Sequence, residues 1–181
     1  YADLVTVYPN RLVNLLAVSP SMKELREVNI PLWSLGPQSI TLDAQVVDQI
    51  REITGTLPSI LQRLPENHLI VISTSLPKED GTRAVGVLIP ADSAMARTVL
   101  EGNRYVGRLN VANSWYLVAM EPLRDLQGHI IGAVSTALRE QLESALKQSI
   151  LKIRVGETGY AYVLDSNGTL VIHPAKEGEN I

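Results

Sequence analysis

The chain has 181 residues, of which 45% are hydrophobic and 19% are charged, and its formal net charge is −3. This composition is typical of a globular protein with one ordinary domain or two small ones. Because nineteen acidic residues outnumber sixteen basic ones, we do not expect a surface that binds nucleic-acid phosphates. Cysteine is absent, which excludes disulfides, cysteine nucleophiles and zinc sites of the cysteine type. No apolar run approaches the roughly 18–20 residues that span a bilayer.

The N-terminal quarter is predicted to be helical. Leucine and valine recur at helical spacing in residues 1–28, and Pro9 and the Ser-Pro-Ser sequence at 19–21 divide this stretch into two helices. Residues 29–40 contain several turn formers and no clear period, so we expect a loop there.

A further helix is predicted at 41–54. Thr41 has the side chain of an N-cap, and Gly55 is typical of a residue that ends a helix.

The rest of the chain is predicted to be rich in strands. Two runs with strand composition are expected to form a hairpin, three more are expected to form an antiparallel meander, and a polar loop and a short helix at 91–102 separate the two groups. The strands are predicted at residues 56–64, 68–76, 104–112, 115–123 and 129–137. A last helix at 138–153 precedes a hairpin with the Ser-Asn-Gly turn at 166–168 at its tip.

These elements predict an α+β fold with one five-stranded antiparallel sheet. The helix at 41–54 is expected to cover one face, and the loop and short helix at 77–102 are expected to arch over the other face and enclose a small pocket. Thr-Gly pairs at 54–55 and 158–159 each follow a predicted helix and lead to a hairpin. This partial repeat indicates that a second, similar unit begins near the end of the chain and that the natural protein continues past Ile181.

The segment GETGYAYVLDSNGTLVIHP at 156–174 resembles the first strands of a Cache module, the PAS-like extracellular sensor of bacterial chemoreceptors and sensor kinases. Eight positions carry the resemblance: Gly156, Thr158, Gly159, Tyr160, Asp165, Gly168, His173 and Pro174. Residues 72–89, 105–111 and 115–134 are similar to the membrane-distal half of the Cache type-three/type-two fusion class. The resemblance covers about residues 41–181, and the N-terminal helices fit the long stalk helix of that family.

The resemblance implies the periplasmic or extracellular region of an inner-membrane receptor that binds a small organic acid or amino acid and forms a homodimer through N-terminal helices. No cofactor is expected. We therefore expect a helical stalk and loop at 1–40, a membrane-distal ligand-binding module at 41–137, and a connecting helix with the first hairpin of an incomplete membrane-proximal module at 138–181. The leading hypothesis is a methyl-accepting chemotaxis receptor, and the alternative is the input domain of a sensor histidine kinase or cyclase.

Two arginines and a threonine are candidates for contact with a carboxylate ligand. Arg83 lies in the loop expected over the pocket, and Arg108 follows Gly107 within a strand. A guanidinium group can hold a carboxylate through two parallel hydrogen bonds. Alternatively, either arginine is solvated or is paired with an acidic side chain, for which the candidates are Asp80, Glu121 and Asp125. Thr74 can offer a hydroxyl group to a bound anion.

Three aromatic residues on the meander are further candidates for ligand contact. Alternation along a strand places Trp115 and Tyr116 on opposite faces, so at most one of them can readily face a ligand. Tyr105 and Arg108 also point apart in a regular strand, unless a bulge at Gly107 realigns them. The competing interpretation is that these rings fill the core of a protein without phenylalanine.

No catalytic or metal-binding role is expected. His68, His129 and His173 lack the spacing of metal ligands. Ser75 and Lys78 match a Ser-x-x-Lys hydrolase signature, but its companion motifs are missing. A Ser-Lys hydrolase, and an interaction module that binds no small molecule, are therefore kept as lower alternatives.

Overall fold

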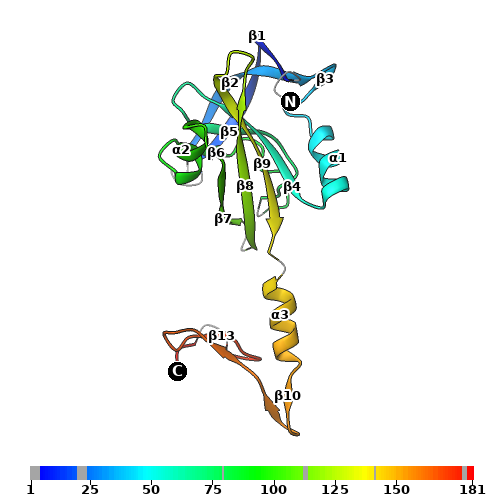
Figure 1. Ribbon diagram of the computed structural model, residues 1–181, viewed down its shortest axis with the longest axis vertical. Coiled ribbons are helices and arrows are strands. Elements are labelled where there is room, and N and C mark those ends of the chain that lie inside the picture. Colours follow the sequence, from blue (N-terminus) through cyan, green and yellow to red (C-terminus); the bar gives the residue numbers. More distant parts are fainter. Residues whose placement is uncertain (1–4, 20–23, 79, 112–113, 141, 177–178) are drawn as a thin grey trace. The chain divides into compact units, whose positions relative to one another are not determined.

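The computed structural model describes residues 5–19, 24–78, 80–111, 114–140, 142–176 and 179–181. The chain forms two compact units, Tyr1–Arg139 and Glu140–Ile181, which Figure 1 shows in sequence colours. Within the described ranges, no helix has both the length and the apolar character needed to cross a membrane.

The first unit is built on a six-stranded antiparallel sheet with the strand order β6-β5-β4-β9-β8-β7. Its strands are β4 (Leu57–Arg63), β5 (Leu69–Thr74), β6 (Leu88–Ile89), β7 (Tyr105–Val111), β8 (Ser114–Arg124) and β9 (Ile130–Arg139). The five strands predicted from the sequence are all present, as β4, β5, β7, β8 and β9. The sheet has a sixth strand because the short β6 pairs with β5 at the edge.

Two helices pack on opposite faces of this sheet, as predicted. They are α1 (Gln45–Thr54) and α2 (Ala94–Leu100). Val47 of α1 packs with Ile60 of β4, whereas Val99 of α2 packs with Leu61, the next residue of the same strand. Because successive side chains of a strand point to opposite faces, the two helices cover different sides. We call these sides the α1 face and the α2 face.

Helix α1 ends as predicted but begins differently. Gly55 follows its last turn with a φ of 69°, a left-handed conformation that glycine adopts at little cost. Thr41 is not the N-cap, because the helix begins after Ala44. The Thr41 hydroxyl instead accepts a hydrogen bond from the Trp33 N–H at 2.8 Å, which ties the chain before α1 to the preceding strand.

The prediction of N-terminal helices and a loop is wrong, because the described residues there form strands. They are β1 (Val5–Ser19), β2 (Glu24–Leu35) and β3 (Gln38–Ser39), paired antiparallel. Leu15 is half-buried whereas Leu12 and Leu16 are exposed, so the leucines that suggested a helical stripe do not share one buried face. Pro9 lies where the pairing of β1 with β2 is interrupted, which a strand tolerates.

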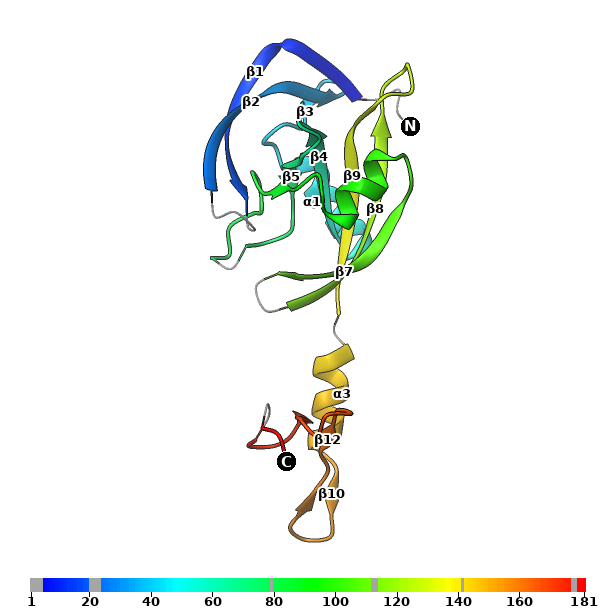
Figure 2. The same cartoon turned by 90° about the vertical axis from the view of Figure 1, so that its left-hand side faces the viewer.

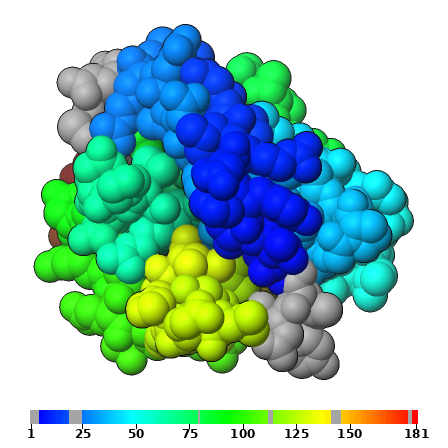
Figure 3. All heavy atoms as spheres, turned by 90° about the horizontal axis from the view of Figure 1, so that it is seen from above, coloured from blue at the N-terminus to red at the C-terminus, as the bar shows by residue number. Residues whose placement is uncertain are grey.

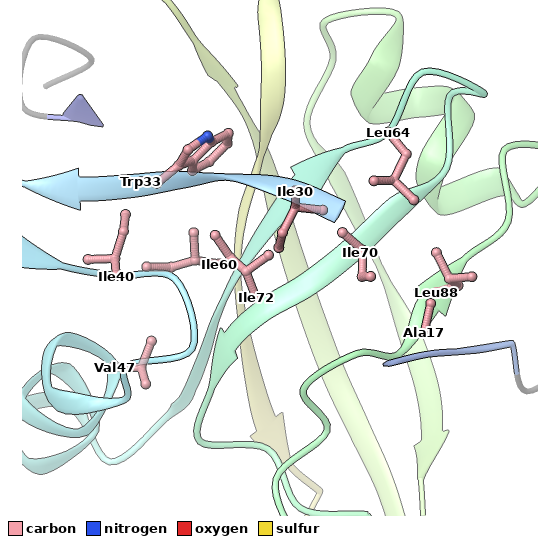
Figure 4. Close-up of a cluster of buried hydrophobic side chains, with 10 residues drawn as sticks. All are labelled: Ala17, Ile30, Trp33, Ile40, Val47, Ile60, Leu64, Ile70, Ile72 and Leu88. Carbon is pink, nitrogen blue, oxygen red and sulfur yellow. The ribbon is translucent and has the colours of Figure 1, made fainter. Parts of the chain in front are cut away.

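The N-terminal hairpin belongs to the same core as the sheet. In Figure 2 the hairpin of β1 and β2 arches over one end of the unit, and Figure 3 shows it from above in blue. Its residues Ile30 and Trp33 are 0% and 1% exposed and pack against the α1 face (Figure 4). A Cβ on Gly132 of β9 would collide with the Leu61 carbonyl oxygen and would lie 2.9 Å from the Trp33 ring, so this glycine makes room for both the backbone of β4 and the indole. Burial of these large apolar side chains fixes the hairpin on the sheet.

The described residues of the second unit contain one helix and two short hairpins. Its elements are α3 (Leu142–Leu151), β10 (Arg154–Val155), β11 (Gly159–Tyr160), β12 (Val163–Leu164) and β13 (Leu170–Ile172). The predicted final hairpin is confirmed as β12 and β13. The two Thr-Gly pairs do not have the same structural role, because Gly55 ends a helix whereas Gly159 pairs with Val155 in a ladder.

The turn of this final hairpin resembles the turn between β8 and β9. One Asp165 carboxylate oxygen accepts hydrogen bonds from the N–H groups of Asn167 and Thr169, at 2.8 and 2.9 Å. One Asp125 oxygen likewise accepts from Gln127 and His129, at 3.0 and 2.8 Å. The backbone N–H donors, that of Thr169 first, lower the pKa of Asp165 below its ordinary value of 3.8.

Candidate functional site

A pair of buried hydroxyl groups lies on the α2 face where β4 and β5 are paired. Ser59 and Thr74 are opposite each other in the register and are 7% and 0% exposed. Their hydroxyl oxygens are 2.6 Å apart, and the Thr74 hydroxyl also accepts a hydrogen bond from the Leu76 N–H at 2.9 Å. Buried hydroxyls are stable when they are hydrogen-bonded in this way. The pair therefore places two hydrogen-bonded polar groups on the α2 face, where Ser135 of β9 lies opposite Ser59.

Tyr116 of β8 lies on the same face and is 5% exposed. It forms a cluster with Val118 and Ala137, and Ala137 pairs in the sheet with Leu57 of β4. Five apolar side chains around the cluster are only partly buried: Leu57, Leu76, Met95, Leu109 and Val111. They come from β4, the loop after β5, α2 and β7. The part of the α2 face around Tyr116 thus combines an aromatic ring with partly buried apolar side chains. Two of these, Leu57 and Leu76, lie two residues from Ser59 and Thr74 in the sequence.

Tyr105 of β7 also faces the α2 side, because it pairs with the buried Met120 of β8. Its ring folds over Gly107 in the same strand, where a Cβ would lie 2.6 Å from the ring carbon Cζ. The register of β7 with β8 continues without a shift through Gly107. The bulge considered from the sequence is therefore absent from this strand, and Gly107 provides space for the Tyr105 ring.

Arg108 and Trp115 lie on the opposite, α1 face. The Arg108 guanidinium carbon is 4.7 Å from the centre of the Trp115 ring, which is the geometry of a cation–π interaction. Trp115 is 40% exposed, whereas Tyr116 is buried, so the predicted separation of these two rings is confirmed. The structure does not bring Arg108 together with Tyr116 or Tyr105.

Arg83 is engaged with α1. Its guanidinium group donates two hydrogen bonds to the two carboxylate oxygens of Asp48, each at 2.8 Å, and a third to the Thr74 carbonyl at 2.8 Å. The carboxylate partner is thus Asp48 and none of the acidic residues considered from the sequence. The ligand-binding roles assigned to Arg83 and Arg108 remain predictions.

Sequence reasoning did not consider Lys78 as a ligand-binding residue. Residues 76–78 lie antiparallel to residues 82–84: the Ala84 N–H donates to the Leu76 carbonyl at 2.9 Å and the Lys78 N–H donates to the Thr82 carbonyl at 2.6 Å. Lys78 is half-buried and follows Leu76, which packs beside Tyr116, by two residues. Lys78 follows Thr74 by four residues and Leu76 by two, and this spacing is the feature of the sequence that indicates Lys78 as a candidate.

The Ser-x-x-Lys signature receives no support from the contacts of its serine. Ser75 is 4% exposed, and its hydroxyl lies 3.4 Å from the Pro58 carbonyl, to which it donates. In the part of the chain that the structure describes, no group of three or more His, Asp or Glu side chains is placed to hold a metal ion.

Comparisons with known proteins place these features in a family context. Residues 3–181 match the model of the Cache 3/Cache 2 fusion domain. No curated protein sequence matches the chain.

Three solved structures are similar to this one, at low sequence identity. The extracellular domain of mmHK1S-Z2, named as a histidine kinase, has 14% identity and a TM-score of 0.40, covering 74% of this chain and 58% of that chain. The IcIR transcriptional regulator from Alicyclobacillus acidocaldarius has 16% identity and a TM-score of 0.41, covering 70% and 69%. The ligand-binding domain of the Pseudomonas aeruginosa PAO1 amino acid chemoreceptor PctC, in complex with GABA, has 13% identity and a TM-score of 0.35, covering 77% and 57%. The chain therefore spans less than two thirds of the first and third of these proteins.

Proposed function

Because this chain belongs to the Cache 3/Cache 2 fusion domain family, we propose that it is the ligand-sensing region of a membrane-anchored bacterial receptor. Cache domains are extracellular sensor domains of membrane receptors, so the proposed location is periplasmic or extracellular. A methyl-accepting chemotaxis receptor is the proposed receptor type, and the input domain of a sensor histidine kinase or cyclase is the alternative. The output domain of the full-length protein distinguishes these two.

The proposed ligand site is the region of the α2 face around Tyr116. The observation that carries this proposal is the buried hydroxyl pair of Ser59 and Thr74 on the face where Tyr116 is surrounded by partly exposed apolar side chains. Sites for small molecules are mostly apolar and contain a few fixed polar groups that orient the ligand. This combination supports a ligand of small size with one polar end.

The proposed ligand carries a carboxylate. Lys78 supplies a positive charge at the edge of the site, and the phenol hydroxyls of Tyr105 and Tyr116 supply hydrogen-bond donors. We propose no catalytic activity, since the Ser75 hydroxyl donates to the Pro58 carbonyl. Homodimerisation stays part of the proposal, but the helices expected to mediate it are strands in the described N-terminal residues.

Thermal unfolding in the presence of small acids tests this function. The probes are acetate, succinate, citrate, L-glutamate and 4-aminobutyrate, and an acid that binds only the folded chain raises its Tm. We expect at least one probe to raise Tm, and we expect Lys78→Ala and Tyr116→Phe to reduce that shift. Lys152→Ala is the matched control, because Lys152 is exposed and lies in the second unit. An absence of any shift, or equal shifts in Lys78→Ala and wild type, would contradict the proposed carboxylate site.

A further inference from the structure

A single guanidinium group joins helix α1 to the end of strand β5. Arg83 holds both carboxylate oxygens of Asp48, which lies in the first turn of α1, and it also holds the carbonyl of Thr74, the last residue of β5. The two N–H groups directed at Asp48 form the fork-shaped pairing that fixes orientation as well as distance. The position of Thr74 is thus set partly by a residue of α1.

The segment before α1 is attached to the same strand. The Ser73 hydroxyl donates to the Asp43 carbonyl at 2.6 Å, and the Leu42 N–H donates to the Ile72 carbonyl at 2.9 Å. Both bonds involve residues just before Thr74. The start of α1 is therefore held against the end of β5 by three consecutive residues of that strand.

The other end of α1 leads to the partner of Thr74. After Gly55 the chain enters β4, whose Ser59 forms the hydroxyl pair with Thr74 on the α2 face. The contacts form a closed circuit from Asp48 through α1 and β4 to Ser59, across to Thr74, and back through Arg83. The hydroxyl pair is thus linked to α1 by two routes, one along β4 and one through Arg83.

We propose that Arg83 is a positioning residue that couples the candidate ligand site to helix α1, without itself contacting the ligand. This inference rests on the proposed function for the existence of a ligand. The coupling itself is argued from the circuit of contacts. Arg83 fixes the Thr74 backbone, while the Thr74 side chain lies on the α2 face. A ligand that favours one position of Thr74 thereby favours one position of α1, and the effect is reciprocal.

Because the Arg83–Asp48 ion pair is exposed, its effect on coupling can be measured separately from its effect on folding stability. The Arg83 and Asp48 side chains are 42% and 37% exposed. Pairs this exposed contribute little to folding stability because water screens their charges. Breaking the pair should therefore leave Tm close to the wild-type value, while it alters the contacts at the end of β5.

Amide hydrogen exchange on the 181-residue chain tests the proposal without any ligand. The variants are Arg83→Gln, Asp48→Asn and the double variant, and the probe is the Leu76 amide, whose N–H donates to the Thr74 hydroxyl. We expect exchange at Leu76 to rise about fivefold in each single variant and no further in the double variant, the size of a modest coupling. The Val118 amide in the middle of β8 is the internal control, and its exchange should stay unchanged.

Three results would overturn the inference. They are unchanged exchange at Leu76 in both single variants, an effect of Arg83→Gln without one of Asp48→Asn, or effects that add in the double variant. Arg83→Lys provides a second measurement if Arg83→Gln does not fold. It keeps the charge but loses the forked pairing, so it should also raise exchange at Leu76.

A second arm uses succinate and separates this inference from the proposed function. In wild type, saturating succinate should slow exchange of the Asp48 amide, which donates to the Ala44 carbonyl in α1. This protection should be lost in Arg83→Gln and Asp48→Asn. If succinate, and then citrate, protects nothing in wild type while the ligand-free effects at Leu76 persist, the proposed carboxylate ligand is contradicted and the coupling is upheld. If succinate binds and its affinity falls only in Arg83→Gln, Arg83 is a direct ligand contact and the inference fails.

Discussion

Replacing Gly107 by alanine should displace the Tyr105 ring from its place over β7. The new Cβ would lie 2.6 Å from Cζ and 3.0 Å from Cε1 of that ring, whereas ordinary contacts begin at 3.4 Å. The ring carbon Cζ must therefore retreat by about 0.8 Å, the difference between 3.4 and 2.6 Å. Tyr105 is half-buried and packs beside Met120, so a displacement of its ring disturbs that packing.

The free-energy cost of displacing the ring is partly offset, because alanine is more favourable than glycine in a strand. Forcing extra volume into a packed position costs about 1–3 kcal/mol. Alanine in a strand is more favourable than glycine by about 0.5–1 kcal/mol, because less backbone freedom is lost on folding. We therefore expect Gly107→Ala to destabilise the wild-type chain by about 0–2.5 kcal/mol. In a Tyr105→Ala background the clash is gone, and the same change should stabilise by about 0.5–1 kcal/mol.

Equilibrium unfolding in urea, followed by tryptophan fluorescence, measures both effects. Both tryptophans, Trp33 and Trp115, belong to the first unit, so the signal reports the unit that contains Gly107. The four chains form a double-mutant cycle, whose expected interaction energy is about 1–3 kcal/mol. Equal effects of Gly107→Ala in the two backgrounds would refute the assignment of Gly107 as space for the Tyr105 ring.

Three further predictions follow from individual contacts. Thr74→Val should destabilise by about 1–3 kcal/mol in urea unfolding, because the buried Ser59 hydroxyl and the partly buried Leu76 N–H lose their partner; an unchanged midpoint would contradict the role of the hydroxyl. The Asp165 carboxyl should titrate below 3.8 by NMR, so its stabilisation of the turn is complete above that pH and is lost as the pH falls through the lower folded-state pKa; titration at or above 3.8 would argue against the hydrogen-bonded turn. Arg108→Ala should leave the Tm shift caused by a bound acid within error, whereas Tyr116→Phe should reduce it, since the two side chains lie on opposite faces; the reverse result would place the site on the α1 face.

Local chemistry made several elements predictable. The five strands predicted for the sheet have strand composition, α1 ends at a glycine, and the turn of the last hairpin contains an aspartate that accepts backbone hydrogen bonds. The family motif at 156–174 is likewise a local pattern, and the family it indicated is the one that residues 3–181 match.

The N-terminal segment was not predictable in this way. Its leucines fit a helical period as well as a strand period, so the local pattern did not distinguish the two. Burial of Ile30 and Trp33 against the sheet decides in favour of strands, and the sheet residues that cover them, such as Ile60 and Gly132, lie far along the chain.

The candidate site was likewise predictable from local sequence only in part. Alternation within a single strand was enough to separate Trp115 from Tyr116, because side-chain direction is a local property. The partner of Arg83 was not accessible, since Asp48 lies 35 residues away on a helix whose position depends on the whole core. By itself the sequence determined the family, five strands of the sheet and the final hairpin. Only the tertiary structure decided which polar groups meet, because those contacts join elements that are brought together by burial of a shared core.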